Sequence, residues 1–231
     1  MPSSKPSPSK SKPNQPTRLL LIRHAEVEQS YHKIFGGTID MNISPRGQEQ
    51  ARALAEFLRG KKMDAIYASP MKRVQQTLAP FLNNGASTLR SATEDGPAQT
   101  IMPALREINF VDWTGLNWEK VCEQFNLDPH EWLDHIERGL TPNGENGAQF
   151  RARVEPCLRE IIAKHPGQTV GIFCHGGVVR MILSILLNLP LPKTNVFEIE
   201  YTSVTQVALR PRITEIELLN FTPWRDLPHE T

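Results

Sequence analysis

Short apolar runs that alternate with amphipathic helical patterns constrain the fold of this chain more than any other feature. Residues 18–22 (Arg-Leu-Leu-Leu-Ile) form such a run, and so do residues 64–68 and Thr169–Cys174. Runs of this length are typical of strands that are covered on both faces of a sheet. We therefore expect three core strands, with a further extended segment over residues 100–105.

Helix signals follow the predicted strands. Ser44-Pro45 matches an N-cap with proline at the first helical position, and Gly60 ends the pattern. Between them apolar side chains recur at helical spacing, at Ala51, Leu54, Ala55 and Leu58. Ser69-Pro70 predicts a second helix start of the same kind, and Gly176-Gly177 opens an apolar helix over residues 178–188.

Strands that alternate with helices predict an α/β protein. We expect a three-layer α/β/α sandwich with a mostly parallel central sheet. Residues 117–165 are expected to be rich in helix. Residues 196–209 and 213–221 alternate enough in polarity to form an antiparallel hairpin, which we place at the edge of the sheet.

Composition separates the first 17 residues from the rest. They consist almost wholly of Pro, Ser and Lys and contain no acidic residue. Such a segment buries too little apolar surface to offset the entropy of ordering, so residues 1–17 are predicted to be a disordered tail. Residues 18–231 are expected to form one domain, with a helical cap around residues 115–147.

The charge balance argues against a polyanionic partner. The 231 residues include 26 Lys and Arg against 25 Asp and Glu, which gives no reason to expect nucleic acid or an anionic membrane as a partner. The longest apolar run, residues 178–189, is too short to cross a bilayer. Three scattered cysteines suit a reducing compartment, so we expect a cytoplasmic protein that acts on a small molecule. A homo-oligomer stays open.

Two histidines follow predicted strands. His24 comes directly after residues 18–22 within Arg23-His24-Ala25-Glu26, and His175 comes directly after Thr169–Cys174. Ligands of open α/β sheets bind at the carboxyl ends of the strands. Gly176-Gly177 adds backbone N–H groups and the positive end of a helix at the same place, which suits an anion.

Around these histidines the chain resembles the histidine phosphatase superfamily, which has a phosphoglycerate mutase-like fold. Arg23-His24-Ala25-Glu26 is similar to its Arg-His-Gly-Glu signature, and residues 69–77 are similar to its Ser-Pro-x-x-Arg-x-x-Gln-Thr segment. Leu105-Arg106-Glu107 resembles its Leu-x-Glu segment, and residues 142–145 and 202–205 match two further short segments. The five motifs occur in order, so the resemblance covers nearly the whole chain.

The resemblance implies a phosphomonoester hydrolase that works through a phosphohistidine and needs neither a metal nor a cofactor. The implied catalytic set is Arg23, His24, Arg73, Glu107 and His175. Further contacts with the substrate are expected at Gly176, Ser30 and Gly37.

These residue types suit the chemistry. A phosphomonoester carries nearly two negative charges, and Arg23 and Arg73 can each offer it a two-pronged fork of N–H donors. A neutral His24 supplies a ring nitrogen that attacks phosphorus. His175 is expected to hold the phosphoryl oxygens as an imidazolium favoured by the bound anion. Glu107 is expected to protonate the leaving oxygen and then to take a proton from water, since the negative charge of bound phosphate favours its acid form.

Some positions depart from the family pattern. Ala25 replaces the glycine of the signature, and Val27 and Ile34 stand where many members have polar residues. The pocket beyond the phosphate is therefore expected to be apolar. Residues 108–111, which follow Glu107, read Ile-Asn-Phe-Val, where mutases have the arginine and aromatic residues that grip a carboxylated substrate. A phosphatase is favoured over a mutase.

Three other readings stay open at this stage. Residues 174–180 fit Cys-x-x-Gly-x-x-Arg, the phosphate loop of cysteine-dependent phosphatases, in which Cys174 would be the nucleophile. A phosphoglycerate mutase-type transfer is a second alternative. A phosphate-binding module without turnover is the third, with Ala25 as the suspicious change.

Overall fold

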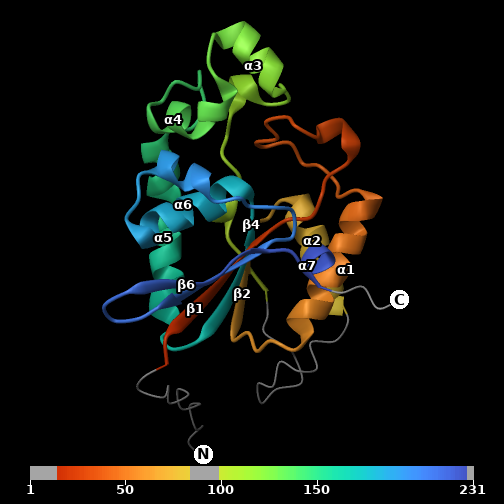
Figure 1. The fold of residues 1–231 in the computed structure, drawn as a ribbon, viewed down its shortest axis with the longest axis vertical. Helices are drawn as coiled ribbons and strands as arrows, with labels where there is room; N and C mark the ends of the chain where they lie inside the picture. The colour runs from red at the N-terminus through yellow and green to blue at the C-terminus, as the bar shows by residue number, and fades with distance from the viewer. Residues whose placement is uncertain (1–14, 84–98, 228–231) are drawn as a thin grey trace, which may run out of the picture.

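The computed structural model describes residues 15–83 and 99–227 (Figure 1). Within these residues, six strands form one sheet in the order β3-β2-β4-β1-β5-β6. The strands are β1 (Thr17–Arg23), β2 (Ala65–Ala68), β3 (Gln99–Ile101), β4 (Thr169–Cys174), β5 (Val204–Leu209) and β6 (Thr214–Phe221). The strands β3, β2, β4 and β1 run parallel to one another, whereas β5 pairs antiparallel with β1 and β6 pairs antiparallel with β5. The mostly parallel sheet with an antiparallel edge confirms the predicted fold class.

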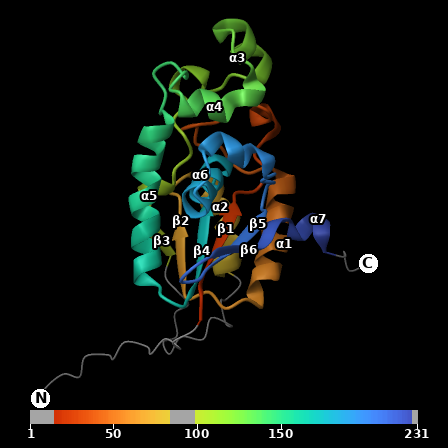
Figure 2. The ribbon, with the colours of Figure 1, turned by 60° about the vertical axis from the view of Figure 1, so that its left-hand side comes forward.

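Helices cover both faces of the sheet (Figure 2). The face layers are α1 (Pro45–Arg59) with α2 (Lys72–Asn83), and α5 (Gly147–Lys164) with α6 (Gly176–Leu187). Side chains of β1 alternate between the two layers: Leu20 and Ile22 pack in the cluster with α1 and α2, whereas Leu19 and Leu21 pack in the cluster with α5 and α6. This two-sided burial explains why the strand is apolar at four successive positions, Leu19 to Ile22.

The remaining helices are short. They are α3 (Trp118–Phe125), α4 (Trp132–Glu137) and α7 (Pro223–Asp226), with 3₁₀ turns at Gln29–Tyr31, Pro103–Leu105, Val111–Trp113, Pro129–Glu131 and Leu191–Val196. In Figures 1 and 2, α3 and α4 lie at the end of the molecule toward which the parallel strands point. Among the described helices, none combines the length and the apolar character needed to cross a membrane.

Local capping chemistry determines where α1 begins. The Ser44 hydroxyl accepts a hydrogen bond from the Gly47 N–H at 2.9 Å, with Pro45 at the first helical position. The same reading of Ser69-Pro70 is wrong by two residues, because α2 begins at Lys72. The Ser69 side chain is instead fully buried, and its hydroxyl lies 2.9 Å from Nε2 of His175, the residue that follows β4.

Two extended segments are shorter than predicted. The segment 100–105 is a strand only to Ile101, because Pro103–Leu105 forms a 3₁₀ turn. The predicted hairpin strand over residues 196–209 begins only at Val204. Its first part contains a 3₁₀ turn and Thr202, whose φ of 54° lies outside the β region.

The predicted tail boundary at residue 17 is also wrong. Thr17 is the first residue of β1 and is paired with Leu209 of β5. Its buried hydroxyl donates to the carbonyl of His165 at 3.0 Å, so packing orders this residue although its neighbours in sequence are polar. Residues 1–14 of the predicted tail lie outside the described residues.

The close approach of α1 to the loop after β1 yields a stability test at Gly47. A Cβ at this buried position would lie 2.2 Å from the carbonyl oxygen of Glu26. Gly47→Ala is therefore expected to lower the free energy of unfolding by about 1–3 kcal/mol, since the backbone must move. Urea denaturation followed by circular dichroism measures this change.

Gly60→Ala is the matched control, because Gly60 has φ −82° and no heavy atom lies within 4 Å of an added Cβ. It is expected to leave stability unchanged or to raise it by about 0.4–1 kcal/mol. Equal stabilities for the two variants would show that α1 does not dock as described.

Candidate active site

The sheet register brings two histidines together. Strands β1 and β4 are parallel neighbours in which Arg23 is level with Cys174, so the next residue of each strand, His24 and His175, leaves the sheet at the same edge. Their ring centroids are 5.2 Å apart at an interplanar angle of 61°. Both side chains are buried. Residues 151 positions apart in sequence thus share one small space.

Hydrogen bonds fix the tautomer of His24. Its Nδ1 lies 2.8 Å from the carbonyl oxygen of Ala25, which only accepts, so Nδ1 carries the proton. The lone pair is then on Nε2, 3.3 Å from the Nε of Arg73. The backbone of this turn is held by Thr77, whose hydroxyl accepts from the Ala25 N–H at 2.8 Å. His24 therefore presents an unprotonated ring nitrogen in a fixed position.

His175 is oriented by Ser69. Its Nε2 lies 2.9 Å from the Ser69 hydroxyl, which also accepts a long hydrogen bond from the Met71 N–H at 3.3 Å. The Ser69 proton has no other acceptor among the described residues, so we assign it to Nε2, which leaves the ring hydrogen of His175 on Nδ1. This buried Nδ1 has no hydrogen-bond partner in the described structure. Sequence reasoning missed Ser69 because Ser-Pro before a helix is also a common capping signal.

Arg73 is buried beside both imidazoles. Its Nη1 and Nη2 donate to the carbonyl oxygens of Ile39 and Gly37 at 2.8 and 3.2 Å. These bonds tie α2 to the loop that follows β1 and hold the guanidinium in one orientation. Only 2% of Arg73 is exposed, so its charge acts in a medium of low dielectric constant.

Arg23 is held from two sides. Its Nη1 donates to the carbonyl oxygen of Ile199 at 2.6 Å, and its guanidinium carbon lies 4.1 Å from the centre of the Tyr201 ring. The buried Nε has no hydrogen-bond partner among the described residues. The sequence did not indicate Tyr201 as a site residue. It precedes Thr202, whose left-handed backbone is not predicted by any short motif.

Glu107 follows the Pro103–Leu105 turn, and its carboxylate packs against the first turn of α6. Its two carboxylate oxygens accept from the backbone N–H groups of Gly177 and Ile108 at 3.3 and 3.1 Å. A Cβ at Gly177 would lie only 2.5 Å from Oε1 of Glu107, so glycine at this position lets the carboxylate approach the helix. The carboxylate is thus fixed at the positive end of a helix.

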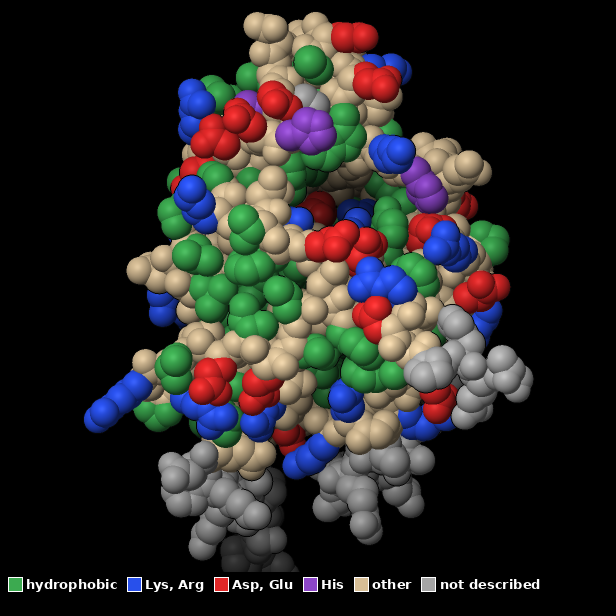
Figure 3. Space-filling view, in the orientation of Figure 1, with side chains coloured by type: hydrophobic (Ala, Val, Ile, Leu, Met, Phe, Trp, Pro, Cys, Tyr) green, Lys and Arg blue, Asp and Glu red, His purple; other side chains and the backbone are tan. Residues whose placement is uncertain are grey.

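These groups surround a cavity of about 270 Å³. Figure 3 shows its mouth below the outer helical end, with hydrophobic and charged side chains around the rim and basic and acidic groups inside. Of the predicted residues, Arg23, His24, Arg73, Glu107, Gly37 and Gly176 line it. His175 is fully buried behind His24. Ser30 is exposed and does not line the cavity, because the turn Gln29–Tyr31 points its neighbour Tyr31 inward instead.

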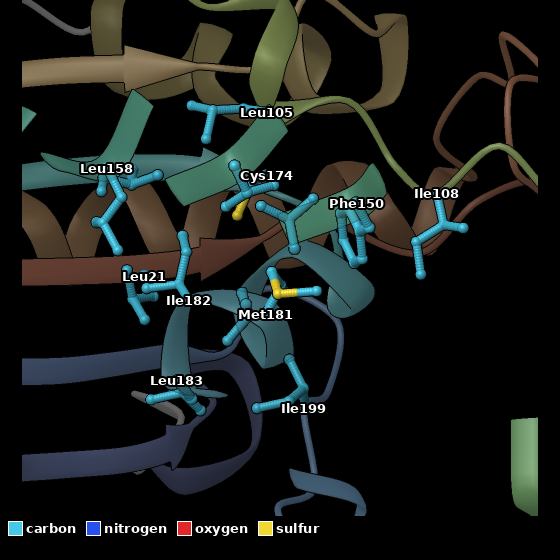
Figure 4. Packing of buried hydrophobic residues seen from close by; sticks show 14 of the residues in the cluster. Leu21, Leu105, Ile108, Phe150, Leu158, Cys174, Met181, Ile182, Leu183 and Ile199 are labelled. Carbon is cyan, nitrogen blue, oxygen red and sulfur yellow. The ribbon is translucent and has the colours of Figure 1, made fainter. Parts of the chain in front are cut away.

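Cys174 is not placed to act as a nucleophile. Its side chain is fully buried among core residues such as Leu21 and Ile182 and does not line the cavity (Figure 4). Burial strongly raises the pKa of this thiol, so a thiolate does not form near neutral pH. The phosphate-loop reading of residues 174–180 is therefore wrong. Among the described residues, no three His, Cys, Asp or Glu side chains are grouped to hold a metal ion.

Burial and positive charge act together on both imidazoles. The pKa of His24 lies well below its ordinary value, first because the ring is buried and second because Arg73 and Arg23 are close. The pKa of His175 is lowered by burial, then by Arg73 and His24. His24 is therefore neutral, as a nucleophile requires. The expected imidazolium at His175 differs from this picture, in which a neutral ring donates through Nδ1.

The lowered pKa of both histidines makes stability depend on pH. Below about pH 6.5 the unfolded chain takes up protons at His24 and His175 that the native state does not bind, so the free energy of unfolding falls as pH is lowered. Each ring contributes about 1.4 kcal/mol per pH unit in that window. We expect His24→Asn to remove about half of the loss in unfolding free energy between pH 6.5 and 5, measured by urea denaturation. The exposed His130, changed to Asn, is the control; an equal slope in both variants would contradict the account.

Comparisons with known proteins agree with this geometry. Residues 19–222 match the family model of the histidine phosphatase superfamily, branch 1. Phosphoserine phosphatase 1 of Hydrogenobacter thermophilus is 30% identical over 205 residues, which cover 89% of this chain and 92% of that protein. A broad-specificity phosphatase of Saccharomyces cerevisiae is 32% identical over 180 residues, covering 75% of this chain and 71% of its own length. The crystal structure of the alpha-ribazole phosphatase from Shigella flexneri has the same fold, with a TM-score of 0.73 at 24% identity over 89% of this chain and 96% of that one. The chain belongs to the histidine phosphatase superfamily.

Proposed function

We propose that this histidine phosphatase hydrolyses small phosphomonoesters through a phosphohistidine on His24. One observation carries the proposal. The Nε2 lone pair of His24 lies in a cavity that Arg23 and Arg73 also line, and two buried groups beside it, Nε of Arg23 and Nδ1 of His175, have no hydrogen-bond partner among the described residues. A phosphoryl group supplies acceptor oxygens and an electrophilic centre at once, so it satisfies both needs.

The first step transfers the phosphoryl group to the enzyme. The Nε2 lone pair of His24 attacks phosphorus and forms an N–P bond while the bond from phosphorus to the ester oxygen breaks. Arg23, Arg73 and the Nδ1–H of His175 hold the three equatorial oxygens, where charge is spread in the transition state. The backbone N–H groups at the start of α6 add to this positive field.

Glu107 moves the proton. In its acid form it donates to the ester oxygen, so the leaving group departs as a neutral alcohol. In the second step the resulting carboxylate takes a proton from water as the water oxygen attacks phosphorus. The P–N bond then breaks, inorganic phosphate is released, and the lone pair returns to Nε2 of His24. Atoms and charges balance over the two steps.

Hydrolysis is favoured over transfer between two substrate positions. The pocket beyond the phosphate is walled by Phe110, Trp118 and Trp132, and Arg180 is the one arginine of its lining besides Arg23 and Arg73. Arg180 already donates to the carbonyl oxygen of Thr194 at 2.5 Å. A carboxylated substrate that has to rebind in two orientations finds few partners here.

We also propose that residues 115–147 act as the cap of the pocket, and that the enzyme works on small molecules in the cytoplasm.

Replacing the nucleophile tests the proposal. His24→Ala is expected to lower the turnover of p-nitrophenyl phosphate by about 10⁴-fold or more, because no other side chain can form the intermediate. Circular dichroism establishes that the variant is folded. Cys174→Ser is the matched control and retains turnover per folded molecule. Substantial turnover by His24→Ala, or loss of turnover in the folded Cys174→Ser variant, would contradict the proposal.

The acid role of Glu107 predicts a dependence on the leaving group. In Glu107→Gln, kcat/KM for an alkyl phosphate is expected to fall about 10²-fold or more, because an alkoxide leaves only when it is protonated. For p-nitrophenyl phosphate, whose leaving group is stable as an anion, the fall is expected to stay below about tenfold. Steady-state kinetics on both esters measures the contrast, and equal losses would remove the acid role.

A further inference from the structure

We propose that this enzyme selects phosphomonoesters whose leaving group is compact, flat and apolar, with a single aromatic ring as the best fit. The inference rests on the proposed function and names its substrate class. The observation behind it is that charged side chains line the cavity near His24, whereas apolar side chains line the rest of it.

All charged side chains of the cavity gather at its inner end. Arg23 and Arg73 flank His24, and the Glu107 carboxylate accepts from the Gly177 N–H on the first turn of α6. Arg180 follows one turn later on the same helix, and its pKa is lowered to about 10, first by burial and then by Arg23. A phosphate at His24 therefore uses the charged region, and the leaving group must occupy the rest.

The outer part of the cavity is aromatic and aliphatic. Its walls come from the loop after β1, the segment after Glu107, and helices α3 and α4. The apolar lining residues here are Val27, Ile34, Phe35, Met41, Phe110, Trp118 and Trp132. Around the mouth in Figure 3, hydrophobic side chains border the opening together with acidic, basic and histidine side chains.

These aromatic rings form a continuous cluster. Phe35 lies 5.0 Å from Phe110 and 5.3 Å from Trp118, and Phe110 lies 6.2 Å from Trp132, measured between ring centroids. Phe35 and Phe110 also contact the fully buried Trp113. Edge-to-face and tilted pairs of this kind accept a further ring readily.

The backbone holds this wall in place. The N–H of Phe35 donates to the carbonyl of Leu116 at 2.9 Å, and the N–H of Gly115 donates back to the carbonyl of Phe35 at 3.0 Å. The loop after β1 is therefore joined to the segment that leads into α3. Trp118 and Trp132 are only half-buried, so their rings keep surface that a ligand can cover.

Polar leaving groups find few partners in this lining. Among the lining residues, Glu107 is the one carboxylate, and none is Asp, Asn, Gln, Ser, Thr or Lys. The ammonium and carboxylate of an amino acid, or the hydroxyls of a sugar, would lose water without gaining matching hydrogen bonds, which disfavours their binding. An apolar ring instead gains free energy when it leaves water for this lining.

The size of the cavity suits a leaving group of one ring. Its 270 Å³ lies at the small end of ligand pockets, which span about 300–1,000 Å³. Part of this volume is taken by the phosphate. A nucleoside or a disaccharide would therefore extend beyond the aromatic wall.

The test compares 2-phenylethyl phosphate with O-phosphoserine. Both release primary alcohols that need protonation, so the contrast reports the leaving-group pocket rather than the chemistry. The wild-type enzyme is expected to show a kcat/KM about a hundredfold higher for 2-phenylethyl phosphate. Trp132→Ala and Trp118→Ala are expected to lower that ratio about tenfold, mainly through KM. Phe57→Ala is the matched control, since Phe57 is a half-buried aromatic residue of α1 that packs on Phe221 outside the cavity.

The outcomes distinguish a failure of the proposed phosphatase function from a failure of the proposed leaving-group preference. Hydrolysis of neither ester by folded enzyme would overturn the proposed function. Hydrolysis of O-phosphoserine as fast as 2-phenylethyl phosphate would overturn this inference and leave the function intact. An unchanged ratio in the two tryptophan variants, or a loss that is equal for both esters, would show that the indoles support the fold and do not select the leaving group.

Discussion

Positive charge buried beside two imidazoles is the interaction on which the rest of this structure depends. Arg73 is almost wholly buried, and Arg23 is held between a carbonyl oxygen and the Tyr201 ring. Burial first, and then the charges of these arginines, disfavour a proton on either His24 or His175. The positive charge that helps to keep the nucleophile neutral also attracts a phosphate dianion, so one arrangement serves both binding and activation.

The fold supports this arrangement from several directions. The parallel register of β1 and β4 fixes the spacing of the histidines, and α2 supplies Arg73 together with Thr77, which braces the turn at Ala25. Backbone carbonyls of the loop after β1 orient the Arg73 fork. Because the groups are held by separate elements, their positions are set before a substrate binds, and little reorganisation is needed during the reaction.

Much of the fold could be predicted from the sequence. The uniform apolarity of residues 18–22 and Thr169–Cys174 indicates burial on two faces, and the Ser44 cap marks the start of α1. Both signals depend only on residues close together in the sequence, so they can be recognised without knowledge of the tertiary structure. The start of α2 was misjudged because Ser69 has a tertiary partner, His175, that competes with capping. The late start of β5 follows from the left-handed backbone at Thr202, which leaves no periodic pattern.

The site shows the same division. The strand-end histidines and the glycines of α6 follow from position along the chain, and the arginines and Glu107 follow from family motifs. The residues that orient them could not be found in this way. Ser69 and Tyr201 act through contacts with residues more than a hundred positions away, and Ser30 was misplaced by the pitch of a single 3₁₀ turn.

The phosphoryl group on His24 is the central claim, and rapid acid-free quenching tests it most directly. Enzyme mixed with p-nitrophenyl phosphate is denatured at alkaline pH, where a phosphoramidate survives, and digested for mass spectrometry. The account predicts one added phosphoryl group, located on the peptide that contains His24 and absent from His24→Ala. A phosphoryl group on another residue would contradict the account. The Glu107→Gln variant, whose second step is slow, should accumulate the intermediate, so an unmodified His24 in that variant during turnover would also contradict it.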